Sequence, residues 1–149
     1  MKARIIARIL LSATLLLQLA SGAPLEMLVF KTPTCGCCAK WVEHMKANGF
    51  NVKVTEVAST EDARRKYGVP ESIVSCHTAV VGGYTIEGHV PAADVQRLLK
   101  LRPKAKGIAV PGMPIGSPGM EQGSRSQAYS VLLFQTDGTT SEFQKYPAK

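Results

Sequence analysis

The sequence is poor in aromatic residues and has no block of basic residues. Phe, Trp and Tyr make up 6% of the 149 residues, and Trp occurs once. The 18 Lys and Arg residues are scattered and are not interleaved with aromatics, which argues against a face that binds nucleic acid. Internal repeats and low-complexity tracts are also absent. The length that remains after removal of an export signal fits a single domain with its own hydrophobic core.

The first residues have the pattern of an export signal. Three basic residues, Lys2, Arg4 and Arg8, precede a short apolar run over residues 9–17. Small residues suited to cleavage follow at positions 20–23. The apolar run is shorter than the roughly 20 residues of a membrane span. We therefore predict a signal peptide over residues 1–22, with cleavage after Gly22. A retained membrane anchor is the alternative.

Cleavage would leave one domain over residues 23–149. The signal contains three basic and no acidic residues, so its removal lowers the net charge from +7 to +4. We expect the mature protein to be periplasmic, without a nucleic-acid partner and without a stable membrane span.

Cysteine is rare, but three of the four cysteines lie within four positions. Cys35 and Cys38 form a C-x-x-C pair with Cys37 between them, while Cys76 lies far along the chain and is followed by His77. A helix N-terminus favours the thiolate form of nearby thiols. Thiolates attack disulfides and bind soft metals. We therefore predict that the four sulfur atoms form one shared site.

The spacing of apolar residues predicts alternating strands and helices. We expect strands over residues 27–30, 52–57, 78–81 and 84–87, the last two joined by a Gly-Gly turn. Helices are expected over residues 39–47, 59–67 and 91–102, so that strand and helix alternate up to the two paired strands. The first two strands would be parallel and the last two antiparallel, which is the order of the thioredoxin-like fold. Thioredoxins carry a cis-proline before the third strand. Here Cys76 lies near that position, so its sulfur is expected to point at the other three.

Beyond Lys104 the sequence is punctuated by Gly and Pro. A long loop from Gly107 would carry Met113 and Met120, whose thioethers are either loop anchors or further ligands for a soft metal. A hairpin of residues 129–134 and 141–144 would follow. The predicted fold class is therefore α/β, a thioredoxin-like βαβ–ββα core with an added C-terminal β-hairpin and a Gly/Pro/Met loop.

Five segments of the sequence form a distinctive set. They contain the three-cysteine cluster, a Trp-Val pair, a Ser-Cys-His-Thr run, a Glu-Gly-His-Val-Pro run and a Pro-Gly-Met-Pro loop, at residues 31–38, 41–42, 75–84, 87–91 and 110–114. Together they resemble the CopG-type copper-resistance proteins. These are exported bacterial proteins that were long described as a domain of unknown function. The resemblance covers nearly all of the mature chain.

The resemblance implies a thioredoxin-like domain whose cysteines hold a multinuclear copper–thiolate site. Its ligands would be Cys35, Cys37, Cys38 and Cys76, all of which are present. It further implies bound Cu(I), with interconversion of Cu(I) and Cu(II) in copper resistance, which would make the protein a copper oxidoreductase. Periplasmic copper-export or copper-oxidising proteins would be its partners.

Ligand chemistry supports copper on separate grounds, with zinc as the alternative. Soft thiolates select Cu(I), and bridging sulfurs allow a few cysteines to hold several ions. Zinc sites usually use two C-x-x-C pairs, whereas Cys76 has no partner two residues away. A zinc site of three cysteines and His77 remains open. His77 is either a ligand, a residue that orients one, or a plain loop histidine.

Two further interpretations of the cysteines remain open. The first is a pair of disulfides, Cys35–Cys38 and Cys37–Cys76, in an oxidising compartment. The second is a thiol–disulfide oxidoreductase, with Cys35 as the attacking thiolate and Cys38 as the resolving thiol. A copper protein in turn is either redox-active or a passive store or chaperone.

Three other side chains are expected to lie outside the site. His44 is two helical turns beyond Cys37 and is expected on the surface. His89 precedes a helix start and is expected to make a local hydrogen bond. Trp41 is expected in the core.

Overall fold

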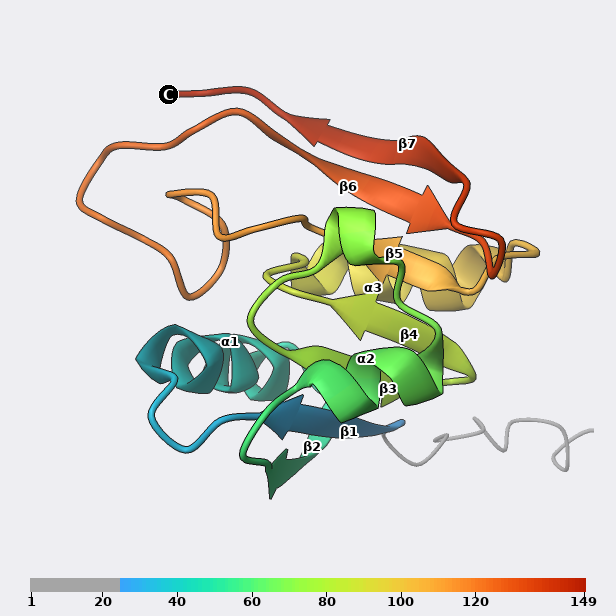
Figure 1. Cartoon of the computed structure of the whole chain (residues 1–149). Helices are drawn as coiled ribbons and strands as arrows, with labels where there is room; N and C mark the ends of the chain where they lie inside the picture. The colour runs from blue at the N-terminus through green and yellow to red at the C-terminus, as the bar shows by residue number, and fades with distance from the viewer. Residues whose placement is uncertain (1–24) are drawn as a thin grey trace, which may run out of the picture.

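The computed structural model describes residues 25–149 as a mixed α/β domain built on one seven-stranded sheet (Figure 1). In chain order the elements are β1 (Glu26–Lys31), α1 (Gly36–Ala47), β2 (Asn51–Glu56), α2 (Glu61–Tyr67), the 3-10 helix η2 (Glu71–Ile73), β3 (Thr78–Val81), β4 (Tyr84–Glu87), α3 (Ala92–Leu101), β5 (Gly107–Ala109), β6 (Tyr129–Phe134) and β7 (Thr140–Tyr146). The predicted signal peptide over residues 1–22 lies outside the described residues. Among the helices that the structure describes, none has the length and apolar character needed to cross a membrane.

The predicted order of strands and helices up to α3 is confirmed. The sheet order is β2-β1-β3-β4-β5-β6-β7, with β1 parallel to β2 and β3 antiparallel to β4. The β3–β4 turn uses Gly82 and Gly83, whose φ angles of 56° and 87° are disfavoured for residues with a Cβ. The α/β class and the C-terminal hairpin of β6 and β7 are confirmed, and the thioredoxin-like assignment stays a prediction.

Helix α1 begins at Gly36, three residues earlier than predicted. The apolar stripe that indicated the helix marks only its buried face, which Trp41, Val42 and Met45 occupy. The first turn is instead stabilised by a cap, because Cys35 Sγ accepts the backbone N–H of Cys38 at 3.4 Å. Cys37 and Cys38 therefore lie within the helix, and Cys35 is its N-cap.

Strand β5 was missed, because residues 107–109 were expected to begin a loop. This three-residue strand is parallel to β4 and antiparallel to β6, so it joins the C-terminal hairpin to the main sheet. It is too short to show an alternating pattern, and glycine is depleted in strands. Gly107 is required there, because a Cβ would overlap the Thr85 carbonyl.

The helices cover both faces of the sheet. Helices α1 and α3 share the main hydrophobic cluster, whereas η2 packs with β5 and β6 in a smaller one. Figure 1 shows α2 on the near side of the sheet and α3 behind it. Trp41 is fully buried in the main cluster, and its Nε1 donates to Val90 O at 2.9 Å. The predicted core position of Trp41 is confirmed.

Glu87, at the end of β4, holds the segment that carries Cys76. Its carboxylate is fully buried and accepts the Ser75 N–H and the Thr78 hydroxyl, each at 2.7 Å. The two donors lie on either side of Cys76 and His77. Burial raises the pKa of Glu87 to about 7, against the lowering effect of these two hydrogen bonds.

We predict that Glu87→Gln gains stability relative to the wild type as the pH rises from 4.5 to 7. The folded protein holds the Glu87 proton more tightly than the unfolded chain, so this carboxyl contributes its full stability below pH 4.5 and loses it as the pH rises to about 7. The amide keeps the same shape without this titration. The relative gain should approach about 3 kcal/mol in chemical unfolding at each pH.

A comparison with the wild type at each pH cancels the titration of the histidines, which is common to both proteins. A stability difference that stays constant between pH 4.5 and pH 7 would contradict the assignment to Glu87.

Candidate metal and redox centre

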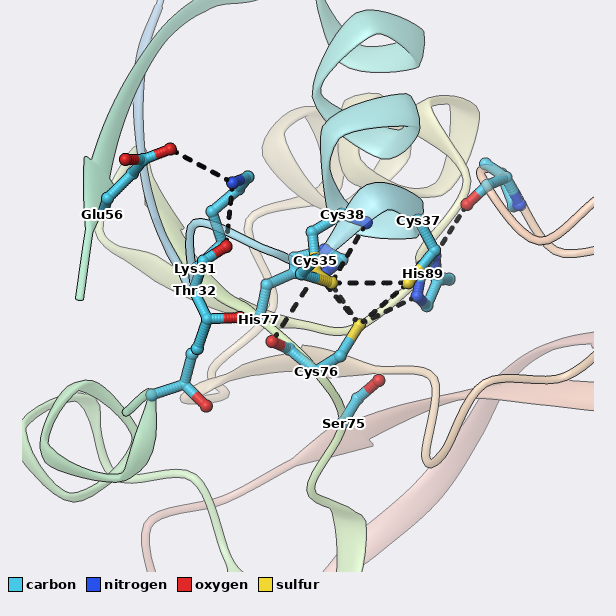
Figure 2. The surroundings of a disulfide bond; sticks show 12 residues. Lys31, Thr32, Cys35, Cys37, Cys38, Glu56, Ser75, Cys76, His77 and His89 are labelled. Atoms are coloured by element: carbon cyan, nitrogen blue, oxygen red, sulfur yellow. Dashed lines mark hydrogen bonds and ion pairs between the residues drawn. A yellow bond between two sulfur atoms is a disulfide. The ribbon is translucent and has the colours of Figure 1, made fainter. Parts of the chain in front are cut away.

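Four sulfur atoms meet where β1 runs into α1. Cys35 caps the helix, Cys37 and Cys38 lie in its first turn, and Cys76 reaches them from the segment before β3. The four Sγ atoms lie within 4.8 Å of one another. Figure 2 shows the Cys76 sulfur pointing at the cluster. The predicted convergence is confirmed, and metal ligation by these cysteines stays a prediction.

Two of the four sulfurs are joined in a disulfide. Cys35 and Cys38 form the bond, and Cys37 and Cys76 are free thiols whose sulfur atoms lie 4.0 Å apart. One of the two bridges considered from the sequence is therefore formed and the other is not. A bridge between residues three positions apart closes a very small loop, so it constrains the unfolded chain little. A scaffolding role alone would therefore gain little stability from this bridge.

Cys76 is the centre of the cluster. Its Sγ lies 3.3 Å from Cys38 Sγ, 3.3 Å from His77 Nδ1 and 3.0 Å from His89 Nε2. Burial raises the pKa of the Cys76 thiol to about 12, and the neighbouring Cys37 adds to the effect. Without a metal ion, Cys76 is therefore a neutral thiol at neutral pH.

His77 lies in the core of the site. It is fully buried beneath Trp41, with 4.3 Å between the ring centroids. Burial, with His89 close by, lowers the pKa of His77 to about 3, so its ring is neutral. Within the described residues its Nε2 has no hydrogen-bond partner. A buried nitrogen of this kind is available to a ligand.

His89 belongs to the site, which the sequence analysis did not predict. The expected local hydrogen bond would have kept it near the start of α3. The structure places it fully buried, with Nε2 on Cys76 Sγ and Nδ1 2.8 Å from Pro118 O. Its neighbours come from separate parts of the chain, so local sequence did not indicate them. Burial lowers its pKa.

His44 stays outside the cluster, as expected, but is partly buried. Its Nε2 accepts the backbone N–H of Ala92 at 3.1 Å, which links α1 to the start of α3. Burial lowers the pKa of His44, which keeps its ring neutral and able to accept this bond.

The Gly/Pro-rich loop packs against the first turns of α1. Gly119 has a φ of 87°, and a Cβ on it would lie 2.6 Å from Cys37 O and 3.0 Å from Trp41 N. Only glycine allows this close approach. Met113 is 51% exposed and Met120 is partly buried, and their role as ligands stays a prediction.

These side chains offer a donor set suited to a soft metal. Four cysteines supply sulfur, and His77 and His89 form a second group of potential ligands with Cys76. Thiolate and imidazole together suit Cu(I) and Zn²⁺. Cys76 belongs to both groups of potential ligands. All four cysteines become available as thiolates only after the disulfide is reduced.

Comparison with known proteins agrees with this chemistry. A search of curated protein sequences finds no match. The model of a family described as "Protein of unknown function, DUF411" matches residues 73–120, which include Cys76, His77 and His89.

Two solved structures, of copper resistance protein CopG in form 1 and form 2, are 46% identical to this chain with a TM-score of 0.79. Each match covers 83% of this chain, and 98% and 99% of the respective CopG chains. Identity at this level over this span establishes a common family. The chain belongs to the CopG family of copper resistance proteins.

Proposed function

We propose that the protein binds Cu(I) through Cys35, Cys37, Cys38 and Cys76 and acts in copper resistance in the periplasm. The observation that carries the proposal is the meeting of four sulfur atoms within 4.8 Å from two distant parts of the chain. The relatives named for copper resistance support the choice of metal.

Several Cu(I) ions per chain fit this donor set better than one Zn²⁺. Thiolate sulfur bridges Cu(I) ions readily, and three cysteines on one helical turn with a fourth facing them favour a small cluster. His77 adds an imidazole nitrogen, and Met113 and Met120 supply thioethers from the loop. A single tetrahedral zinc ion would use the four sulfurs once each and leave the imidazoles of His77 and His89, which form a second group of potential ligands with Cys76, unused.

The Cys35–Cys38 pair gives the site a source of electrons when it is in the reduced, dithiol form. Oxidation of two thiolates to a disulfide releases two electrons, which reduce two Cu(II) to two Cu(I). Cys35 and Cys38 are the pair that forms this bond in the structure. The protein would thereby interconvert Cu(I) and Cu(II) as a copper oxidoreductase, working with copper-export or copper-oxidising proteins of the periplasm.

A thiol–disulfide oxidoreductase is the second candidate, favoured by the disulfide at the N-terminus of α1. Cys35 is partly exposed, so a substrate thiol has access to it. However, Cys37 Sγ lies 3.4 Å from Cys35 Sγ and would compete with Cys38 in resolving every mixed disulfide. A passive store or copper chaperone is the third candidate, and it differs by lacking electron transfer.

We predict that the reduced, metal-free protein binds more than one Cu(I) per chain. Anaerobic titration against a competing Cu(I) chelator measures the stoichiometry. Cys37→Ser should reduce it to one ion or fewer, because the substitution removes a bridging sulfur. His44→Gln, on the same helix but outside the cluster, should leave it unchanged, and excess Zn²⁺ should not displace the copper.

The opposite pattern would favour the oxidoreductase. It consists of unchanged Cu(I) binding by Cys37→Ser together with rapid disulfide exchange between the protein and a test peptide.

We predict that the fully reduced protein reduces Cu(II) with two ions consumed for each disulfide formed. The ratio follows from the two-electron thiol couple. Absorbance of a Cu(I)-specific chelator counts the product, and mass spectrometry counts the disulfides. Cys38→Ser should lose the stoichiometric reaction, since it can form neither the Cys35–Cys38 bond nor a bond between Cys38 and Cys76. Cu(II) that stays oxidised in the presence of the reduced wild type would support the passive store.

We predict that the full-length chain is exported and cleaved between residues 20 and 23. N-terminal sequencing of protein recovered from a periplasmic fraction should begin between residues 21 and 24. Recovery of a chain that retains Met1 from that fraction would overturn the export prediction.

A further inference from the structure

A free thiol lies against the Cys35–Cys38 disulfide and beside a buried imidazole. We propose that Cys76 is the nucleophile of an internal thiol–disulfide exchange, with His89 as its general base, which moves the disulfide from Cys35–Cys38 to Cys38–Cys76. The inference goes beyond copper binding and does not depend on it, because the exchange needs only the metal-free protein.

The sulfur atoms are placed for attack at one end of the disulfide. Cys76 Sγ lies 3.3 Å from Cys38 Sγ, within the roughly 3–3.5 Å separation of groups poised to react. Cys38 is fully buried, so thiols in solution have no access to it. Cys35 is partly exposed and is the end that an external thiol would attack. An internal nucleophile therefore opens the bond from the end opposite to the one accessible from solvent.

His89 is oriented to accept the Cys76 proton (Figure 2). Its Nδ1 lies 2.8 Å from Pro118 O, and because a carbonyl oxygen only accepts hydrogen bonds, Nδ1 carries the imidazole proton. Its Nε2 therefore presents a lone pair to Cys76 Sγ at 3.0 Å. A nucleophile, a base and a group that orients the base are all in place.

Atoms and electrons balance without an outside reagent. Cys76 Sγ–H gives its proton to His89 Nε2 as the sulfur attacks Cys38 Sγ. The Cys38–Cys76 bond forms, the Cys35–Cys38 bond breaks, and its electron pair leaves on Cys35. The Cys35 thiolate then takes a proton from the imidazolium through solvent or stays ionised, so the protein keeps one disulfide and two free cysteines.

The leaving group is stabilised by the helix. Cys35 is the N-cap of α1, and its Sγ already accepts the Cys38 N–H at 3.4 Å. The positive end of the helix dipole favours a thiolate there. The exchange thus moves the disulfide onto the fully buried Cys38 and the partly exposed Cys76, and it releases a partly exposed, activated thiolate beside Cys37. Such a pair of sulfurs is able to accept a soft metal ion or an external disulfide.

Cys37 offers a competing route that has a different product. Its Sγ lies 3.4 Å from Cys35 Sγ, so its attack would release Cys38 and join two cysteines that are two positions apart. The two routes therefore differ in which thiol is set free, Cys35 or Cys38.

The test is to trap the released thiol in the metal-free protein. Protein carrying the Cys35–Cys38 disulfide is incubated with a metal chelator and iodoacetamide at several concentrations, without reductant, and peptides are mapped over time. We expect alkylated Cys35 together with a Cys38–Cys76 linkage. In Cys76→Ser, Cys35 should stay bonded to Cys38 and escape alkylation.

His89→Gln should slow the alkylation of Cys35 by about tenfold or more, the scale of a lost general base. His44→Gln is the matched control and should react at the wild-type rate. Circular dichroism checks the fold of each variant. Two results in the wild type alone would overturn the proposal. One is an intact Cys35–Cys38 bond with Cys76 alkylated directly. The other is release of Cys38 in place of Cys35. Both results are obtained without copper, so failure of this proposal can be distinguished from failure of the proposed Cu(I) binding.

Discussion

The site depends on how one short segment is held against a helix end. Cys76 comes from a stretch far along the chain from the other cysteines, and the Glu87 carboxylate holds that stretch from both sides through Ser75 N and Thr78 Oγ1. The backbone N–H of Gly88 adds a bond to His77 O at 3.0 Å. Burying a carboxylate costs free energy unless it is well hydrogen-bonded. At this cost, the Glu87 carboxylate fixes the position of the segment that carries Cys76.

The disulfide and the proposed metal site would use the same sulfur atoms. The structure has the Cys35–Cys38 bond, which withholds two of the four sulfurs from a metal ion, and reduction would return them as thiolates. Cys76 contacts the disulfide on one side and two neutral imidazoles on the other. In the proposed function, the redox state of the cysteines and metal binding are therefore linked through shared sulfur atoms.

The C-terminal third of the chain contributes to the site as well as to the sheet. Strand β5 pairs with both β4 and β6 and so attaches the last hairpin to the core. The loop between β5 and β6 then places Pro118 O on His89 and Gly119 on the first turns of α1. This loop orients the imidazole and covers the helix end, so it completes a site that the four cysteines begin.

The sequence by itself determined the cysteine cluster at a helix start, the Gly82-Gly83 hairpin, the buried Trp41 and the order of the elements as far as α3, because these depend on residues close together in the chain. The thioredoxin-like comparison and the CopG resemblance also led to the correct expectation that Cys76 faces the cluster. Only the tertiary structure decided which two sulfurs are bonded, that β5 exists and that His89 contacts Cys76. Each of these depends on distances between groups that the chain brings together only on folding, and neither spacing nor periodicity encodes such distances.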